Sequence, residues 1–278
     1  MRLHALAAVL LWALAASAHA QQPAPAAKGG EYAPTYGEEG KDVIWVPTPD
    51  PVVDVVLDMA RLKPDDLLVD LGSGDGRIVI AAARRGFRAV GIEYNEKLVE
   101  YSIRMAEKAG VADKTRFVKD DIFTADLSSF TVIVLFLRPK LNMQLLPRLI
   151  ELKPGTRVIS HRFLLGEWKP DEQRVGAEGR IVHQWIVPAK VAGSWSLQSG
   201  NRRYGLRLEQ KYQQVRGTAT VGGKEVPLRA VKLDGANIRF TLDDGTAHEF
   251  TGRVAGNTME GAAADGSGKW TAARRAAR

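Results

Sequence analysis

Hydrophobic residues between positions 50 and 187 alternate between helical spacing and short, strand-like runs. A first helix is predicted to begin at Asp50, which can cap free amides, with Pro51 in its first turn. It is predicted to end before Lys63-Pro64. Strands are then predicted at 67–71, 88–93, 116–119, 132–137, 157–161 and 181–187, with helices at 77–85, 95–109 and 141–152. This alternation is typical of a doubly wound, Rossmann-like α/β sheet, whose ligand lies at the carboxyl ends of its strands.

The pattern changes at Ala192 to eight short alternating runs separated by turns rich in Gly, Asn and Asp, and one of these runs is EVPLRAVKL. Such runs predict a small all-β meander or barrel, separate from the first sheet. Trp195 and Trp270, in the first and last runs, are predicted core residues that barrel closure brings together. The predicted organisation is a leader at 1–20, a flexible arm at 21–42, an α/β domain at 43–190 and a β domain at 191–278.

The stretch VDLGSGDGRIVI, residues 69–80, places a glycine-rich turn between the first of these strands and the next helix. A turn of this kind usually cradles a nucleotide, but its GxGxG spacing differs from the GxGxxG of dinucleotide sites. Asp70 and Asp75 stand beside it and are expected to face the ligand. A carboxylate about 4 Å from a pyrophosphate would cost roughly 1 to 4 kcal/mol at surface-like dielectric. S-adenosylmethionine instead carries an ammonium and a sulfonium, so the turn favours this cofactor.

Carboxylates also stand at the ends of the next two predicted strands. Glu93 can hold ribose hydroxyls, while Asp120 and Asp121 close the third strand, where a carboxylate can accept from an adenine amino group. Asp70, Glu93 and Asp121 thus stand at the ends of three successive strands, which favours a cofactor site over separate caps or surface charges. For Asp75 or Asp120 taken singly, a cap or a surface charge explains the residue equally well.

Here the sequence resembles a known group of enzymes. VDLGSGDGRIVIAAARRGFRAVGIEYN is similar to motif I and the following strand of class I S-adenosylmethionine-dependent methyltransferases. More narrowly, WVPTPDPVVDVVL, LVEYS, FVKDDIF and HRFLLGEWKPD resemble segments of the lysine methyltransferases that act on the c subunit of ATP synthase. The resemblance covers about residues 43–187.

The resemblance implies a role for each matching residue. Asp70 and the glycines of the turn would line the methionine part of the cofactor, Glu93 would hold the ribose, and Asp121 would contact the adenine. Thr48 matches a position near the amino-acid end of the cofactor, or is simply a turn residue at the helix entry. The predicted cofactor-binding residues are Thr48, Asp70, Gly72, Ser73, Gly74, Glu93, Asp120 and Asp121. The implied reaction is N-methylation of a protein lysine or another amine.

The methyl acceptor is expected near the ends of the fourth and fifth strands. In-line methyl transfer needs a positioned nucleophile and exclusion of water, not covalent catalysis. A lone histidine such as His161 could be a base but is more often structural, so no catalytic residue is assigned. Candidates for the pocket are Phe136, Arg138, His161, Phe163 and Trp168, with Tyr36 and Trp45 as a lid from the arm or as simple packing.

Composition narrows the chemistry further. The 278 residues include no cysteine, which excludes disulfides, thiolate metal sites and a cysteine nucleophile, and no metal site is predicted. The net charge of +7 is spread along the chain, so we expect solvated surface charge and no specific nucleic-acid partner.

The first twenty residues, MRLHALAAVLLWALAASAHA, have the three parts of a secretory signal. Arg2 supplies the positive end, residues 5–15 a short apolar core, and Ala18-His19-Ala20 a small-x-small cleavage site. We therefore expect export, to the periplasm, with cleavage after Ala20. The alternative is an uncleaved leader that anchors the chain in the membrane.

Three features depart from the pattern of the resembled family: the leader, the β-rich tail, and FLRPKLN after the fourth strand, where no Asn-Pro-Pro-Tyr motif of amide-nitrogen methylation stands. Two alternatives to a protein methyltransferase therefore stay open. One is an exported S-adenosylmethionine-binding protein without turnover, and the other is a small-molecule methyltransferase.

Overall fold

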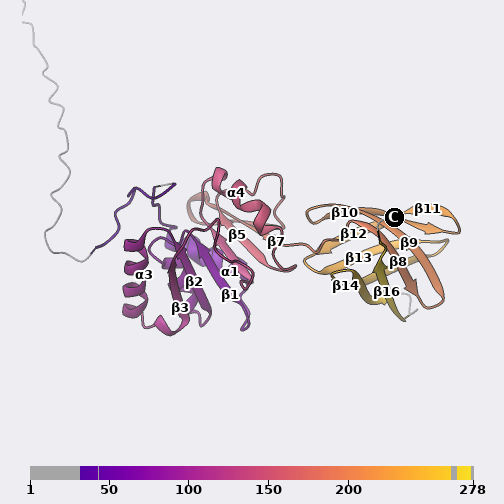
Figure 1. Cartoon of the computed structure of the whole chain (residues 1–278), viewed down its shortest axis with the longest axis horizontal. Helices are drawn as coiled ribbons and strands as arrows, with labels where there is room; N and C mark the ends of the chain where they lie inside the picture. The colour runs from indigo at the N-terminus through magenta and orange to yellow at the C-terminus, as the bar shows by residue number, and fades with distance from the viewer. Residues whose placement is uncertain (1–31, 43, 264–267, 277–278) are drawn as a thin grey trace, which may run out of the picture. The chain divides into compact units, whose positions relative to one another are not determined.

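The computed structural model describes residues 32–42, 44–263 and 268–276, drawn in colour in Figure 1. The predicted leader, residues 1–20, and the first part of the predicted arm lie outside the described residues. Within the described part of the chain, no helix combines the length and the apolar character needed to cross a membrane.

The first sheet has seven strands in the order β3-β2-β1-β4-β5-β7-β6. Strands β1 to β5 run parallel, and β7 and β6 extend the sheet antiparallel. The strands are β1 (Leu67–Leu71), β2 (Arg88–Glu93), β3 (Thr115–Lys119), β4 (Val132–Leu135), β5 (Arg157–His161), β6 (Glu172–Val175) and β7 (Ile181–Ile186).

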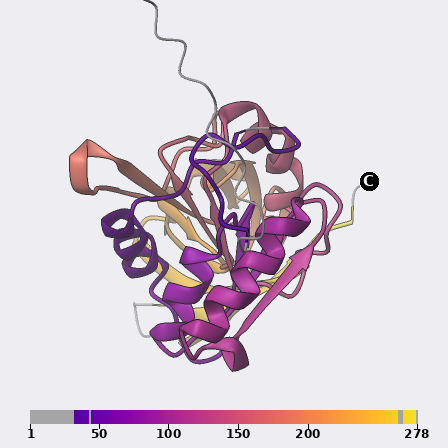
Figure 2. The same ribbon diagram turned by 90° about the vertical axis from the view of Figure 1, so that its left-hand side faces the viewer.

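Helices cover both faces of this sheet, as Figures 1 and 2 show. Successive residues of a strand point to opposite faces, so in β4 Val132 packs with the first two helices while Ile133 packs with the fourth. The helices are α1 (Asp50–Ala60), α2 (Arg77–Arg84), α3 (Glu96–Lys108) and α4 (Pro139–Leu149), with short 3₁₀ turns η1 (Ala112–Lys114) and η2 (Ala177–Gly179). The predicted doubly wound α/β fold is confirmed.

Some local predictions are wrong. Asp50 does not cap α1: Pro49 is the N-cap residue, without a side-chain cap, and Asp50 is the first helical residue, 3.5 Å from the guanidinium of Arg77. Strand β6 lies outside the predicted strands, because its sequence EQRV is mostly exposed and lacks a hydrophobic face. The fourth strand ends at Leu135 rather than at residue 137.

The second sheet has nine antiparallel strands in the order β11-β10-β9-β8-β16-β15-β14-β13-β12. No strand pairing joins it to the first sheet among the described residues, in agreement with the predicted separate β architecture. Its strands are β8 (Gly193–Ser199), β9 (Arg202–Lys211), β10 (Gln214–Val221), β11 (Lys224–Pro227), β12 (Arg229–Asp234), β13 (Asn237–Asp243), β14 (Ala247–Ala255), β15 (Thr258–Ala263) and β16 (Gly268–Arg274).

The two edge strands of this second sheet, β11 and β12, follow each other directly in the chain. The run EVPLRAVKL is not one strand: β11 pairs with β10, β12 pairs with β13, and only Leu228 lies between them. A change of register near Ala230, whose φ is +48°, helps the chain turn from one sheet edge to the other. The sheet therefore curls into a nearly closed barrel with its seam at β11 and β12.

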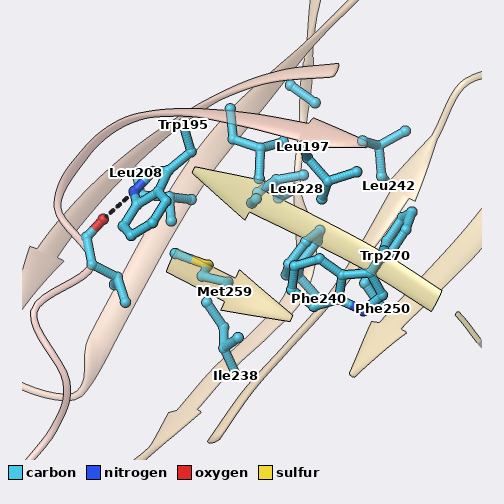
Figure 3. Close-up of a cluster of buried hydrophobic side chains, with 14 of the residues drawn as sticks. Trp195, Leu197, Leu208, Leu228, Ile238, Phe240, Leu242, Phe250, Met259 and Trp270 are labelled. Carbon is cyan, nitrogen blue, oxygen red and sulfur yellow. Dashed lines mark hydrogen bonds between the residues drawn. The ribbon is translucent and has the colours of Figure 1, made fainter. Parts of the chain in front are cut away.

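The barrel interior holds both predicted tryptophans (Figure 3). The first and last strands do pair, with Trp270 opposite Ser199, but this pair lies in the middle of the strand order rather than at the seam. Trp195 donates its indole N–H to the carbonyl of Val191 at 2.8 Å, whereas Trp270 packs edge-on against two phenylalanines. The two rings thus share a core but have different neighbours.

Candidate functional site

Three glycines with left-handed backbone shape the turn between β1 and α2: φ is +77° at Gly72, +55° at Gly74 and +78° at Gly76. The first two amides of the turn donate to the carbonyl of Ile92 in β2, at 2.8 and 3.1 Å. A Cβ at Gly74 would lie 2.4 Å from the indole nitrogen of Trp45. The indole of Trp45 therefore covers Gly74, whereas Gly72 exposes bare backbone at the carboxyl end of the sheet, as a closely bound nucleotide requires.

The two acids near this turn differ in their surroundings. Asp70 is only 4% exposed, and its burial, with smaller contributions from Glu93 and Asp75, raises the pKa of its carboxyl well above the ordinary 3.8. Asp75 pairs with Arg77, whose Nη2 lies 2.7 Å from its Oδ2. Asp75 is thus paired with a neighbouring side chain, and it does not line the cavity described below.

Glu93 ends β2 and is held by two backbone amides. Its Oε2 accepts from the amide of Gly74 at 3.0 Å and its Oε1 from the amide of Asn95 at 2.9 Å. Asn95 in turn caps α3 by accepting from the amide of Lys97. The carboxylate is thus fixed between the glycine turn and the start of a helix, where it can accept from ribose hydroxyls.

The two acids after β3 also differ in their surroundings. Asp121 accepts from the amide of Phe123 at 2.9 Å, and its Oδ2 lies 2.7 Å from the ammonium of Lys41. The hydrogen bond from Lys41 is the main cause of a lowered pKa at Asp121. The same ammonium lies 4.5 Å from the ring centre of Tyr94. Asp120 is exposed and accepts from the amide of Asp121 at 2.7 Å.

A cavity of about 550 Å³ opens at this end of the sheet. Among the predicted cofactor-binding residues, Gly72, Glu93 and Asp121 line it, whereas Thr48, Asp70, Ser73, Gly74 and Asp120 lie outside its wall. Of the predicted acceptor residues, Phe136, Arg138 and Phe163 also line it, and His161 and Trp168 do not. The cavity therefore joins the expected cofactor side to the expected acceptor side.

His161 lies behind the cavity wall. Its ring centre is 4.1 Å from that of Phe136, and its Nδ1 lies 3.5 Å from the hydroxyl of Thr48. Burial, followed by the charges of Arg180 and Arg162, lowers the pKa of His161 to about 4, so the ring is neutral near pH 7. This position suits a side chain that supports Phe136 better than a base in contact with the acceptor.

Ser73 is buried beside the glycine turn, and its hydroxyl has no hydrogen-bond partner among the residues that the structure describes. Its oxygen lies 2.5 Å from where a Cβ at Gly91 would stand, so it packs toward β2. Ser73 therefore packs behind the turn and does not line the cavity.

Sequence reasoning missed most of the arm's contribution. Residues 36, 38–42 and 44–46 line the cavity, and two backbone hydrogen bonds between Trp45 and residues 37 and 38 fold the arm back on itself. Tyr36 and Trp45 are predicted candidates for a lid, but nothing in the sequence marks Lys41 as a partner of Asp121. Tyr94 and Ile122 were also missed, although each directly follows a predicted cofactor-binding residue in the chain.

The residues at the cavity fit S-adenosylmethionine. Gly72 presents bare backbone to the cavity, Glu93 and Asp121 present carboxylates to it, and Asp70 is buried behind the turn. Across residues 32–42, 44–263 and 268–276, no group of three or more His, Asp or Glu side chains is placed to hold a metal ion.

Comparison with known proteins agrees with this geometry. A family profile described as the ANTKMT methyltransferase domain matches residues 70–172. A protein-lysine N-methyltransferase of Saccharolobus islandicus is 42% identical over 144 residues, which span 51% of this chain and 89% of the relative. The lysine N-methyltransferase of the ATP synthase c subunit from Mus musculus is 43% identical over 174 residues, 56% of this chain and 70% of the relative.

A solved structure is also similar. It is a Salinibacter ruber protein described as an RNA methyltransferase in complex with S-adenosyl-L-homocysteine. It is 49% identical, with a TM-score of 0.51, and the match covers 52% of this chain and 96% of that one. These similarities, together with the cavity, mark the first sheet as the part of the chain that binds the cofactor.

Proposed function

Because the chain belongs to the S-adenosylmethionine-dependent methyltransferase family that contains these protein-lysine N-methyltransferases, we propose that it methylates the side-chain amine of lysine in a protein acceptor. Two names among its relatives point to lysine, whereas the similar Salinibacter protein is described as an RNA methyltransferase. The charges at the cavity favour lysine.

The observation that carries this proposal is an excess of carboxylates in the cavity wall. The wall holds five acids, Glu38, Glu39, Asp42, Glu93 and Asp121, against three bases, Lys41, Arg138 and Arg162. Three of the acids come from the arm. A lysine ammonium approaching this wall is attracted, whereas a phosphate backbone is repelled by it.

The aromatic side of the cavity supports the same interpretation. The rings of Phe136 and Phe163 are nearly parallel, 6.4 Å apart between centres, and both line the cavity. Such a wall removes water from an amine and favours its neutral, nucleophilic form. S-adenosylmethionine supplies an electrophilic methyl group when bound, held by Glu93, Asp121 and the glycine turn. The residues of this chain would therefore act by binding, orienting and drying the acceptor.

The test supplies labelled S-adenosylmethionine with two acceptors, a lysine-containing protein mixture and total RNA. Label on lysine, lost when the lysines are blocked by prior dimethylation, is the expected result. Glu93→Ala serves as the cofactor-binding control, since losing hydrogen bonds to a charged group should weaken cofactor binding by about 1 to 3 kcal/mol. Label on RNA alone would overturn the proposal, and label on neither would favour a binding protein without turnover.

Export is a second proposal, and it rests on the sequence of residues 1–20. We propose that the leader is removed after Ala20 and that the enzyme works outside the cytoplasm. Mass spectrometry of the native protein should then find Gln21 as the first residue. A soluble cytoplasmic pool that retains Met1 would contradict this.

A further inference from the structure

The loop between β5 and β6, residues 162–171, links the acceptor side of the cavity to the second sheet. Phe163, near the start of this loop, lines the cavity, and Trp168, five positions later, is fully buried. The loop therefore has one end in the candidate active site and the other in an apolar environment.

The near end of the loop is fixed by β5 and α4 of the first domain. The hydroxyl of Ser160 donates to the carbonyl of Phe163 at 2.7 Å, and Nδ2 of the buried Asn142 donates to the carbonyl of Leu164 at 3.2 Å. Leu165, which is fully buried, forms an isolated β-bridge with Trp168. Movement of Trp168 would therefore be transmitted over a short, well-packed segment to the aromatic wall of the cavity.

The far end of the loop is held by the turn between β9 and β10 of the barrel. Trp168 donates its indole N–H to Oε1 of Gln213 at 3.0 Å, and its ring stacks on Tyr212 with 5.8 Å between centres. Nε2 of Gln213 donates to the carbonyl of Lys169 at 2.7 Å and to Oδ1 of Asp171 at 3.2 Å. Gln213 thus uses both ends of its amide on one loop of the neighbouring sheet.

The backbone of this barrel turn is itself unusual. Tyr212 has φ of +55°, a left-handed conformation that a residue with a Cβ seldom adopts. Its ring packs against the apolar cluster of the first sheet that contains Trp168 and Trp185. This left-handed conformation is common in the two-residue turn of a hairpin, and here the turn brings the ring of Tyr212 against the loop that reaches the cavity.

We propose that Gln213 and Tyr212 are positioning residues for methyl transfer: the barrel holds Trp168, and through the loop it sets the place of Phe163 against the acceptor. The inference rests on the proposed function in one respect, that the acceptor amine lies against Phe163. The proposal gives the second sheet a role in the methyl transfer that takes place at the first sheet.

The experiment uses the full chain and two kinds of readout. Gln213→Ala should lower kcat/KM for the protein acceptor by about tenfold to a hundredfold, because small misplacements of a positioned group cost rates of that order. Affinity for S-adenosylhomocysteine should stay unchanged, since the contacts of Gln213 are with the loop and not with the cofactor side. Gln198→Ala is the matched control, a glutamine of the same sheet that donates to the carbonyl of Gly200 in its own turn.

Hydrogen exchange supplies the readout that needs no acceptor. In Gln213→Ala the amides of residues 162–168 should exchange faster, while those of the glycine turn should not change. Trp168→Phe, which keeps a ring but removes the indole N–H, should reproduce the effect, and the double variant should add little to either single one.

The outcomes separate the two proposals. If the wild-type chain labels no protein acceptor but the loop loosens in Gln213→Ala, the proposed function has failed and the proposed link between barrel and loop stands. If kcat/KM for the acceptor is unchanged, or only the melting temperature falls, Gln213 is merely structural and the positioning role is wrong. Unchanged exchange in residues 162–168 would also overturn it.

Discussion

Asp70 is the residue whose chemistry depends most on the presence of a cationic ligand. Because burial raises its pKa well above 3.8, the folded chain holds the proton to a higher pH than the unfolded chain does. Its contribution to stability is therefore fully present below the unfolded value and is lost as the pH rises through the raised pKa. The cofactor's ammonium and sulfonium favour the ionised carboxylate, so binding should strengthen over the same rise.

We expect Asp70→Asn to remove both dependences on pH. The free variant should melt at a higher temperature than the wild-type chain above the raised pKa, and its weak binding of S-adenosylmethionine should not vary with pH. Thermal melts and calorimetry over a pH series measure the two effects, with the exposed Asp65→Asn as control. A wild-type affinity that stays flat across the series would show that Asp70 does not face the cofactor's charge.

Lys41 occupies the carboxylate that adenine is expected to use. We expect the adenine amino group to compete with the ammonium of Lys41 for Asp121, and displacement of Lys41 would also take its ammonium from the ring of Tyr94. Lys41→Ala should then tighten cofactor binding only slightly, because exposed ion pairs are weak. The measurement is calorimetry with S-adenosylhomocysteine.

Lys119→Ala provides the matched control for Lys41. Lys119 forms a similar exposed pair, 2.6 Å from Glu96, and neither residue lines the cavity. Its removal should leave the affinity unchanged. Weaker binding in Lys41→Ala would mean that Lys41 remains on the bound cofactor, and the expected displacement would be wrong.

At the scale of elements, strands with a hydrophobic pattern could be predicted from the sequence, and β6, which lacks one, could not. The bounds of β1, β2 and β5 match the prediction because turns or loops with Gly, Asp or Pro flank runs rich in buried apolar residues. Strand β6 escapes prediction because an edge strand paired on one side needs no hydrophobic pattern. The run EVPLRAVKL keeps the period of a strand across Pro227. Its alternation therefore does not reveal that β11 and β12 pair with different strands.

The candidate site likewise contains residues that could be predicted from the sequence and contacts that could not. Glu93 and Asp121 could be found because Glu93 ends one strand of the parallel sheet and Asp121 comes just after another, where topology alone places them together. Two ion pairs, Asp75 with Arg77 and Lys41 with Asp121, depend on side-chain positions that are fixed only in the folded chain. Contacts between segments far apart in sequence, such as Trp168 with Gln213, have no local signal at all.

Gly252 makes room for a tryptophan inside the barrel. Gly252 lies opposite Gly261, and Gly261 lies opposite Trp270 in the next strand. A Cβ at Gly252 would stand 2.4 Å from Cζ2 of Trp270 and 2.4 Å from the carbonyl oxygen of Glu260. Gly252→Ala should therefore destabilise the barrel by about 1 to 3 kcal/mol through overpacking.

Denaturant unfolding followed by tryptophan fluorescence measures the effect of Gly252→Ala. Ala262→Ser is the matched control, a one-atom addition at an exposed position of β15. The control should unfold like the wild-type chain. Equal stability of all three proteins would show that the slot around Trp270 adapts without cost.

At the scale of the whole molecule, each sheet is complete in its own strand pairing, yet they share contacts at Trp168. A chain that ends at Lys190 retains all seven strands of the first sheet and every residue that lines the cavity. It loses Gln213 and Tyr212, which leaves an unpaired indole N–H and an uncovered ring. We expect this fragment to fold and bind the cofactor, with stability lower by about 1 to 3 kcal/mol.

Thermal unfolding and calorimetry on this fragment, beside the full chain, test that expectation. Retained affinity with a lowered melting temperature would support two domains in contact. A fragment that fails to fold would instead show that the sheets form a shared core.

The pairing of β8 with β16 sets an order on synthesis. A growing chain completes the seven-stranded sheet and then makes β8, but the partner of β8 on one side is the last strand, ending at Arg274. Until that strand emerges, β8 offers an open edge on which other chains can pair and aggregate. A message truncated shortly before residue 268 would therefore yield a protein with an intact cofactor site and an unpaired sheet edge. Loss of solubility, rather than loss of methyl transfer, would be the first sign of such incomplete copies.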